Sequence, residues 1–380
     1  MTNILFLIDT LHGGGAEKVL CTLVNHMDPE KFCITVLTEE PVDSHAYLRP
    51  GIRYRSICPF KSSLGKKLFH FWLRLCAQLK WVYPLYIRGN YDIEVAYLEC
   101  GPTKYLAQST NRQALKLAWV HCDLTQKEGI AAQAQKLQKQ YSAYDMAVCV
   151  SQNVQQSFRA LIGEYPKSAV VYNACDEAEI RHKALAGVPV PVNGLRLVAV
   201  GRLSKEKGYD RLLDACRRLW QEGESFTLQI LGDGSERLAL EAQIAREGLE
   251  NCVQLLGFQK NPYPYLKAAD VVVCSSRYEG FSTVVTEALI LGKCILTTDC
   301  SGMDELLGDS EYGLIVDNST QGLCEGLKKL LSSQAIRQAY AKKALARGED
   351  FSLTTRVRQT EEFLLQSLQE KRNSEKHLQH

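Results

Sequence analysis

The chain has 380 residues, of which 46% are hydrophobic and 23% are charged, and its formal net charge is +2. This length suits two domains better than one core. The near balance of charge gives no sign of a nucleic-acid partner, so any basic surface must be local. The 14 cysteines lack the spacing of zinc knuckles and thioredoxin-like sites, and no secretion signal is visible. We therefore expect a reducing cytoplasm, where the glycosylation sequon at Asn318 carries no meaning.

In the first half of the chain, short aliphatic runs alternate with amphipathic stretches such as 16–27 and 153–161. Runs that are nearly free of charge are typical of strands buried on both faces of a parallel sheet. The pattern predicts an α/β domain over residues 1–180, doubly wound like a Rossmann fold. Its expected strands are 4–8, 33–38, 93–98, 117–121 and 146–150.

The same pattern restarts after a segment rich in glycine and proline, 184–193, which we expect to be a linker. It predicts a second Rossmann-like domain over 193–350, and we expect a final helix over 352–372 to pack back on the first domain. Two such domains facing each other would form a cleft lined by the loops that follow strands. The expected strands of the second domain are 195–200, 226–231, 252–256, 271–274, 294–297 and 313–316.

Three glycines, Gly13, Gly14 and Gly15, follow the first expected strand and precede a helix. Free backbone N–H groups at such a turn favour an anion. A tight turn without a ligand is the alternative. A dinucleotide-binding fingerprint would place another glycine at Lys18, so a nicotinamide enzyme is disfavoured.

A second loop, 201–208, follows the first strand of the second domain and contains Arg202 and Lys207. Arginine binds phosphate oxygens bidentately and lysine adds a mobile cation, so the two could hold a diphosphate without a metal. The alternative is a solvated charged turn. Another strand-end turn, at Gly232, is common in sequence and has low specificity.

The third loop, 278–288, holds two glutamates around a predicted helix start. Ser282 is a suitable N-cap for a helix over 283–291, with Glu279 before the cap and Glu287 inside the helix. The N–H groups at the helix start favour a phosphate, and carboxylates accept hydrogen bonds from sugar hydroxyls. Taken singly, each glutamate is better explained as an ordinary surface or helix charge.

Together these loops resemble the retaining glycosyltransferases of the GT-B fold known as group 1 or family 4. The likeness rests on the glycine loop at 13–17, the Gly-Arg-Leu…Lys-Gly motif at 201–208 and the two glutamates seven residues apart, and it runs from about residue 3 to about residue 330. The segment 171–176 is similar to the family's Asn-Gly-Val-Asp segment, but Ala174 replaces the glycine and Tyr172 the proline, so we assign it no role.

The resemblance implies roles at the matching positions. Arg202 and Lys207 would bind the donor diphosphate, Glu279 the sugar hydroxyls and Glu287 the ribose. His121 matches the family's active-site histidine, although an imidazole satisfied in the core is the alternative. The implied catalytic residues are His121, Arg202, Lys207 and Glu279, and the implied donor-binding residues are Gly14, Gly15, Gly201, Gly232, Phe258, Gly280, Phe281, Ser282, Thr283 and Glu287.

The implied function is retaining transfer of a hexose or N-acetylhexosamine from a nucleotide diphosphate sugar. We expect UDP as the nucleotide and a glycan or lipid-linked acceptor, in surface polysaccharide or glycoconjugate assembly. No cofactor or metal is expected, because no Asp-x-Asp motif follows a strand. The alternatives are a nucleotide-sugar epimerase of the same fold and a non-catalytic partner subunit.

A basic amphipathic pattern over 64–83 concerns the acceptor. Such a helix can lie on an anionic membrane, which would place the enzyme on the inner face of the plasma membrane. The alternative is a core-facing helix with a solvated basic side. Its apolar face is expected at Leu64, Leu68, Trp72, Leu75, Leu79 and Val82, flanked by Lys61, Lys66, Lys67, His70, Arg74 and Lys80.

Overall fold

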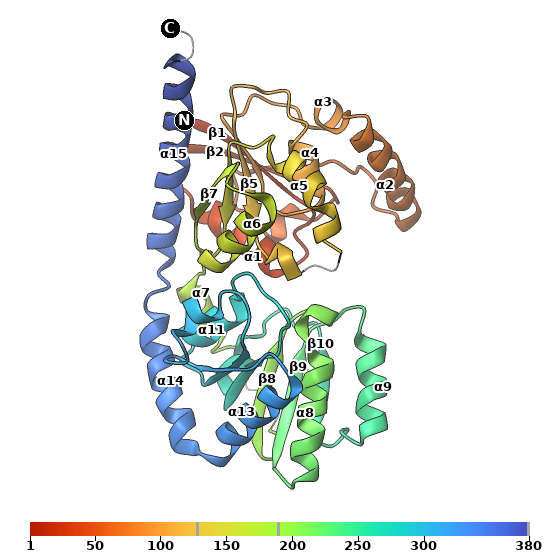
Figure 1. The fold of residues 1–380 in the computed structure, drawn as a ribbon, viewed down its shortest axis with the longest axis vertical. Helices are drawn as coiled ribbons and strands as arrows, with labels where there is room; N and C mark the ends of the chain where they lie inside the picture. The colour runs from red at the N-terminus through yellow and green to blue at the C-terminus, as the bar shows by residue number, and fades with distance from the viewer. Residues whose placement is uncertain (127–128, 188–190, 378–380) are drawn as a thin grey trace. The chain divides into compact units, whose positions relative to one another are not determined.

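The computed structural model describes residues 1–126, 129–187 and 191–377. It divides into two compact units, Met1–Ala174 with Thr354–His380, and Cys175–Leu353 (Figure 1). The division falls before residue 180 because helix α7 (Glu177–Lys183) packs against helices of the second unit. Within the expected linker 184–193, residues 188–190 lie outside the described residues.

The first unit is built on a seven-stranded sheet in the order β3-β2-β1-β4-β5-β6-β7, and every neighbouring pair is parallel. The strand order reverses between β1 and β4, where ligands bind in open sheets of this kind. The strands are β1 (Thr2–Ile8), β2 (Phe32–Thr38), β3 (Arg53–Ser56), β4 (Ile93–Ala96), β5 (Leu115–Val120), β6 (Met146–Cys149) and β7 (Lys167–Val170).

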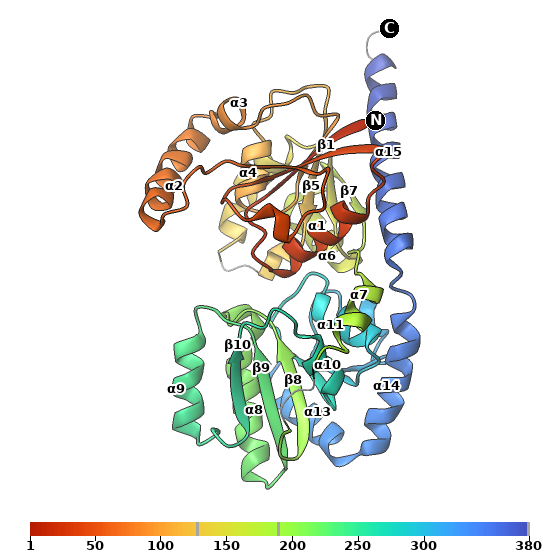
Figure 2. The same cartoon turned by 180° about the vertical axis from the view of Figure 1, so that it is seen from behind.

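Helices cover this sheet, and the last one returns from the far end of the chain. Helix α15 (Leu353–His377) lies beside the first unit in both views (Figures 1 and 2). Its Glu361 accepts the backbone N–H of Asp28 at 2.6 Å, and its Lys371 pairs with Asp145 at 2.8 Å. The other helices of the unit are α1 (Gly15–His26), α2 (Ser63–Gln78), α3 (Val82–Tyr86), α4 (Gly101–Leu106), α5 (Ala134–Tyr141) and α6 (Gln152–Ile162).

The helix expected over 64–83 is two helices, α2 and α3. At the end of α2, Lys80 takes a left-handed conformation with φ of 60°. The next N–H, that of Trp81, donates to the carbonyl of Cys76 at 2.8 Å. A left-handed residue followed by such a bond is the Schellman motif that ends helices. The prediction of one continuous helix was wrong because this motif usually uses glycine, and here a lysine takes its place.

The second unit is built on a six-stranded parallel sheet in the order β10-β9-β8-β11-β12-β13, which reverses between β8 and β11. Its helices bury a continuous apolar core against one face, with Leu212, Leu213 and Leu228 fully enclosed. The strands are β8 (Leu195–Val200), β9 (Phe226–Leu231), β10 (Val253–Gly257), β11 (Val271–Cys274), β12 (Ile295–Thr298) and β13 (Leu314–Val316). Besides α7, the helices are α8 (Tyr209–Gln221), α9 (Arg237–Glu247), α10 (Tyr263–Ala268), α11 (Thr283–Ile290), α12 (Met303–Leu307), α13 (Thr320–Ser332) and α14 (Gln334–Gly348).

These two sheets confirm the predicted fold class of two Rossmann-like doubly wound domains. The buried strands coincide with the apolar runs of the sequence. Two strands of the first sheet, β3 and β7, were not predicted. Both lie at an edge of the sheet and carry polar, partly exposed residues, so no apolar run marks them.

Candidate functional site

Two predicted motifs of the second unit meet where its strand order reverses. Strand β8 leads into the short helical turn Lys205–Lys207, and its neighbour β11 leads into the loop that carries Glu279. Parallel strands end at the same edge, so the two loops lie side by side. They enclose a pocket whose lining comes from both loops and from the start of α11: Val200, Lys207, Tyr209, Val273, Cys274, Ser275, Ser276, Glu279, Ser282 and Val284.

Two residues that line this pocket, Lys207 and Glu279, form an ion pair. The Lys207 Nζ atom is 2.6 Å from Glu279 Oε1, and Ser276 Oγ donates to the same oxygen at 2.6 Å. Burial opposes the charge on Lys207, but the Glu279 carboxylate outweighs it and holds the pKa of Lys207 above its ordinary value. The lysine is therefore cationic at neutral pH and paired with the Glu279 carboxylate.

Glycine is required where these loops approach neighbouring backbone. A Cβ atom on Gly232 would collide with the carbonyl of Gly201, and φ at Gly232 is +145°. Gly208 has φ of +62°, and a Cβ atom there would collide with the carbonyl of Ser275. These glycines thus hold the strand-end loops in close contact, which is a structural role.

The expected cap at the start of α11 is present. Ser282 Oγ accepts the N–H of Val285 at 3.4 Å, and Thr283 is the first helical residue. Ser282 and Phe281 are 4% and 8% exposed. A helix start beside a cationic lysine favours an anion in the pocket.

Glu287 lies further along α11 and is only 4% exposed. The hydroxyl of Tyr263 lies 3.5 Å from Glu287 Oε1. Arg202 and Phe258, by contrast, have exposed side chains at the ends of β8 and β10. The roles of these three residues toward a donor stay predictions.

In the first unit, His121 directly follows β5, and a buried carboxylate fixes its backbone. Glu99 Oε1 accepts the N–H groups of His121 at 2.6 Å and Cys122 at 3.0 Å. Burial lowers the pKa of His121 to about 4, against the opposing effects of Glu99 and the Tyr97 backbone, so the ring is neutral at pH 7. Its Nε2 atom is buried without a hydrogen-bond partner among the described residues. A fully satisfied core imidazole therefore does not describe His121.

The glycine loop of the first unit is surrounded by carboxylates. The Glu17 carboxylate lies so close to Gly14 that a Cβ atom there would collide with it. Burial, followed by the charges of Glu39 and Glu17, raises the pKa of Asp9 to about 7. This acidic setting opposes the phosphate binding expected at Gly14 and Gly15. The sequence pattern missed it because each carboxylate resembles an ordinary loop charge.

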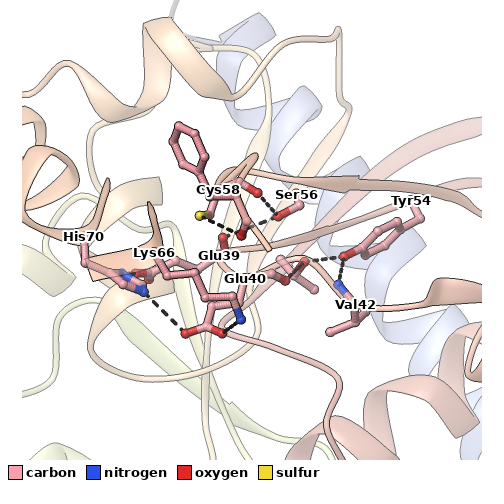
Figure 3. A network of polar contacts seen from close by, with 10 residues as sticks. Glu39, Glu40, Val42, Tyr54, Ser56, Cys58, Lys66 and His70 are labelled. Carbon is pink, nitrogen blue, oxygen red and sulfur yellow. Dashed lines mark hydrogen bonds and ion pairs between the residues drawn. The ribbon is translucent and has the colours of Figure 1, made fainter. Parts of the chain in front are cut away.

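A polar network attaches α2 to the loop that follows β2 (Figure 3). Lys66 Nζ pairs with Glu40 at 2.6 Å, and His70 contacts Glu39 at 2.9 Å and Glu40 at 3.3 Å. The hydrogen bond from Lys66 lowers the pKa of Glu40, against the effect of burial. In the same network, the Tyr54 hydroxyl accepts the N–H of Val42 at 2.8 Å. One flank of α2 is thereby fixed to the sheet.

The opposite side of α2 is apolar and exposed. The buried stripe consists of Phe69, Leu73, Cys76 and Ala77. The core-facing interpretation of the predicted apolar face was therefore wrong, apart from Val82, which is buried on α3. The exposed large apolar side chains of this region are Phe60, Leu64, Leu68, Phe71, Trp72, Leu75, Leu79, Trp81 and Leu85.

Across 1–126, 129–187 and 191–377, no group of three or more His, Cys, Asp or Glu side chains could hold a metal ion. No helix within these same ranges is long and apolar enough to cross a membrane. Independence from metals stays a prediction.

Comparisons with known proteins agree with the fold. Residues 185–347 match the family model described as glycosyl transferases group 1. A Campylobacter jejuni protein, N-acetylgalactosamine-N,N'-diacetylbacillosaminyl-diphospho-undecaprenol 4-alpha-N-acetylgalactosaminyltransferase, is 36% identical over 201 residues, which are 52% of this chain and 54% of that protein. The chain thus spans about half the length of this relative. LpsD of Rhizobium meliloti, a lipopolysaccharide core biosynthesis glycosyltransferase, is 25% identical over 86% of this chain and 87% of its own length.

Solved structures match over nearly the whole chain. Anabaena HepE, in complex with UDP and glucose, has a TM-score of 0.75 at 22% identity and covers 96% of this chain and 99% of its own. Sucrose-phosphate synthase from Thermosynechococcus elongatus has a TM-score of 0.76 at 17% identity, with 96% and 98% covered. At these identities the likeness establishes the fold alone. The match to the group 1 glycosyl transferases thus covers residues 185–347, and the solved structures show the GT-B fold over nearly the whole chain.

Proposed function

We propose that this chain transfers a hexose or N-acetylhexosamine from a nucleotide diphosphate sugar, with UDP as the nucleotide, to a glycan or lipid-linked acceptor. The transfer would serve polysaccharide or glycoconjugate assembly. The observation that carries the proposal is the Lys207–Glu279 pair at the strand-order reversal of the second unit, next to the capped start of α11. Two comparisons support it: HepE was solved with UDP and glucose, and the Campylobacter relative is named for a diphospho-undecaprenol acceptor.

In the proposed reaction, the bond between the anomeric carbon and the leaving phosphate oxygen breaks, and the acceptor oxygen forms the new bond. With retention by front-face attack, the acceptor proton passes to the departing diphosphate. Lys207, Arg202 and the start of α11 would stabilise the charge that develops on this leaving group. Glu279 would orient the sugar through its hydroxyls and would form no covalent bond. Because protein cations supply the positive charge, we expect transfer to continue in the presence of a chelator.

The site assignment predicts the effect of two substitutions. Lys207→Ala removes the cation beside the leaving group, and Glu279→Ala removes the proposed sugar contact. Each should lower kcat/KM by about 100-fold or more, as expected when a charge-stabilising group is lost. Arg217→Ala, more than two turns into α8 and beside Glu247, is the matched control and should stay near wild-type activity. Near-normal transfer by both folded site variants would contradict the assignment.

The donor is identified by screening nucleotide sugars for thermal stabilisation. A ligand at 100 times its dissociation constant should add about 2.7 kcal/mol of stability. Nucleotide release is then measured with and without glycan and lipid-linked acceptors. Release that requires an acceptor supports transfer. Conversion of the bound sugar without any acceptor would instead indicate the epimerase alternative, which no comparison supports.

We further propose that the exposed face of α2 contacts the cytoplasmic surface of an anionic membrane, where a lipid-linked acceptor would reside. Leu64, Leu68 and Phe71 are 71%, 67% and 74% exposed. No aspartate or glutamate occurs from residue 44 to residue 91. Exposed apolar side chains flanked only by basic charges match an anionic lipid surface. From residue 61 to residue 91, the exposed basic residues are Lys61, Lys67, Arg74, Lys80 and Arg88.

Co-sedimentation with vesicles tests this contact. We expect binding to vesicles rich in anionic lipid, weak binding to zwitterionic vesicles, and release as salt screens the basic side chains. The double variant Leu68→Glu/Phe71→Glu should lose binding but keep its fold. Leu238→Glu, at a 78% exposed position on α9, is the control and should bind normally. Equal binding by wild type and the α2 variant would exclude this surface.

A further inference from the structure

The separation between Lys207 and Glu279 depends on how two backbone segments are held together. Three successive carbonyls of the Lys205–Lys207 turn accept hydrogen bonds from the loop that carries Glu279. Arg277 Nη1 donates to Lys205 at 2.6 Å, and the Arg277 N–H donates to Glu206 at 2.7 Å. Ser275 Oγ donates to the carbonyl of Lys207 at 2.8 Å. The cation and the carboxylate of the pocket are thus carried on one cross-linked unit.

The Arg277 guanidinium is itself fixed by a carboxylate. Its Nη1 and Nη2 atoms lie 2.8 Å and 2.6 Å from the two oxygens of Asp210, in the first turn of α8. Such a bidentate pair fixes direction as well as distance, which a lysine cannot do. Because Asp210 neutralises this charge locally, Arg277 contributes geometry to the pocket more than a free positive charge.

Asn318 holds the same loop from the opposite side. Its Nδ2 atom donates to the carbonyls of Arg277 and Asp299, both at 2.9 Å. Its Oδ1 atom accepts from Arg211 Nη2 at 2.8 Å, and that nitrogen also lies 3.1 Å from the carbonyl of Ser275. Asn318, the first residue of the glycosylation sequon, therefore has a structural role.

We propose that Arg277 is a positioning residue for the transfer reaction: its bidentate pair with Asp210 and its bond to Lys205 set the place of Lys207 relative to Glu279. The inference rests on the proposed donor function of that pair. Arg277 acts through the turn and does not contact the donor. Displacing a charge-stabilising group by about 1 Å can cost about 100-fold in rate. The contacts of Arg277 therefore affect the rate even though Arg277 does not touch the substrate.

The test compares Arg277→Lys, which keeps the positive charge but cannot form the bidentate pair with Asp210, with Arg277→Ala. Arg218→Ala is the control, because Arg218 is an exposed arginine of α8 whose guanidinium donates to the Gln321 side chain at 2.9 Å. We expect kcat/KM to fall at least 10-fold in both Arg277 variants, and less than twofold in the control. Amide hydrogen exchange in the Lys205–Lys207 turn should accelerate in both Arg277 variants, without any ligand. In a Lys207→Ala background, Arg277→Ala should cost less than twofold more.

Three results would overturn the inference. Wild-type kinetics in Arg277→Lys would mean that charge suffices. An undiminished loss when Arg277→Ala is added to Lys207→Ala would mean that Arg277 acts independently of the lysine. If Arg277→Ala does not fold, Arg277→Lys and Asp210→Asn carry the same comparison. Unchanged amide exchange in a folded Arg277→Lys variant would contradict the positioning role of Arg277. A wild-type protein that binds no nucleotide sugar would instead contradict the proposed function.

Discussion

At the scale of single residues, the sequence brought Lys207 and Glu279 together but missed the acidic surroundings of the glycine loop. Lys207 and Glu279 belong to motifs that follow strands, and those strands are neighbours, so the motifs meet at 2.6 Å. Arg277 was not predicted, because its role depends on three backbone carbonyls and a carboxylate 67 residues away. Asp9 was missed for a related reason: its environment comes from burial and from carboxylates on separate elements, such as Glu39 after β2 and Glu17 in α1.

Asp9 supports a prediction about pH. Its folded-state pKa is raised from 3.8 to about 7, so the folded protein binds this proton more tightly than the unfolded chain does. The stability that this provides is complete below pH 4 and is lost as pH rises toward 7. Asp9→Asn removes this pH-dependent loss of stability, because asparagine does not ionise. The free energy of unfolding of the variant, relative to wild type, should increase from pH 5 to pH 7 by up to about 1.4 kcal/mol per pH unit, and then level off. Tm measured for both proteins from pH 5 to pH 8 checks this increase. A difference that stays constant with pH would contradict the raised pKa.

At the scale of elements, apolar periodicity located the buried strands but not the limits of α2. The pattern from Leu64 to Val82 is continuous, yet the backbone turns at Lys80. Periodicity also assigned the wrong face, since α2 has a buried stripe at Phe69 and Leu73 and a second, exposed apolar side. A sequence pattern cannot distinguish the core from another apolar surface when a helix carries both.

Lys80 provides a prediction at this scale. A non-glycine residue with φ of 60° carries a backbone cost that glycine does not. Lys80→Gly should therefore stabilise the first unit, by up to about 1 kcal/mol. Lys67→Gly, at an exposed position within α2, is the matched change and should destabilise it by about 1 kcal/mol. Thermal unfolding of both variants measures this difference, and destabilisation by both would contradict the left-handed end of α2.

At the scale of the whole molecule, the two parallel sheets follow from two series of apolar runs, and their recognition needed no motif. The last helix was also expected to return to the first unit. Its anchoring depends on individual contacts between the ends of the chain, such as Glu361 with Asp28 and Arg372 with Asp92 at 2.6 Å each. Such contacts leave no periodic signal, because the partners lie more than 250 residues apart.

Glu361 tests how much this return of the chain contributes to the first unit. It is 5% exposed, and its carboxylate accepts the N–H of Asp28 at 2.6 Å and pairs with Lys31 at 3.2 Å. Removing it leaves a backbone N–H without its acceptor, so Glu361→Ala should cost about 1–3 kcal/mol. The adjacent Glu362 has a 64% exposed side chain and lies 3.8 Å from Arg358. Glu362→Ala should cost less than about 0.5 kcal/mol. Equal unfolding midpoints for the two variants in denaturant would mean that this contact of α15 adds little to the stability of the first unit. A larger loss of stability for Glu361→Ala would mean that the contact of α15 with Asp28 and Lys31 stabilises the first unit.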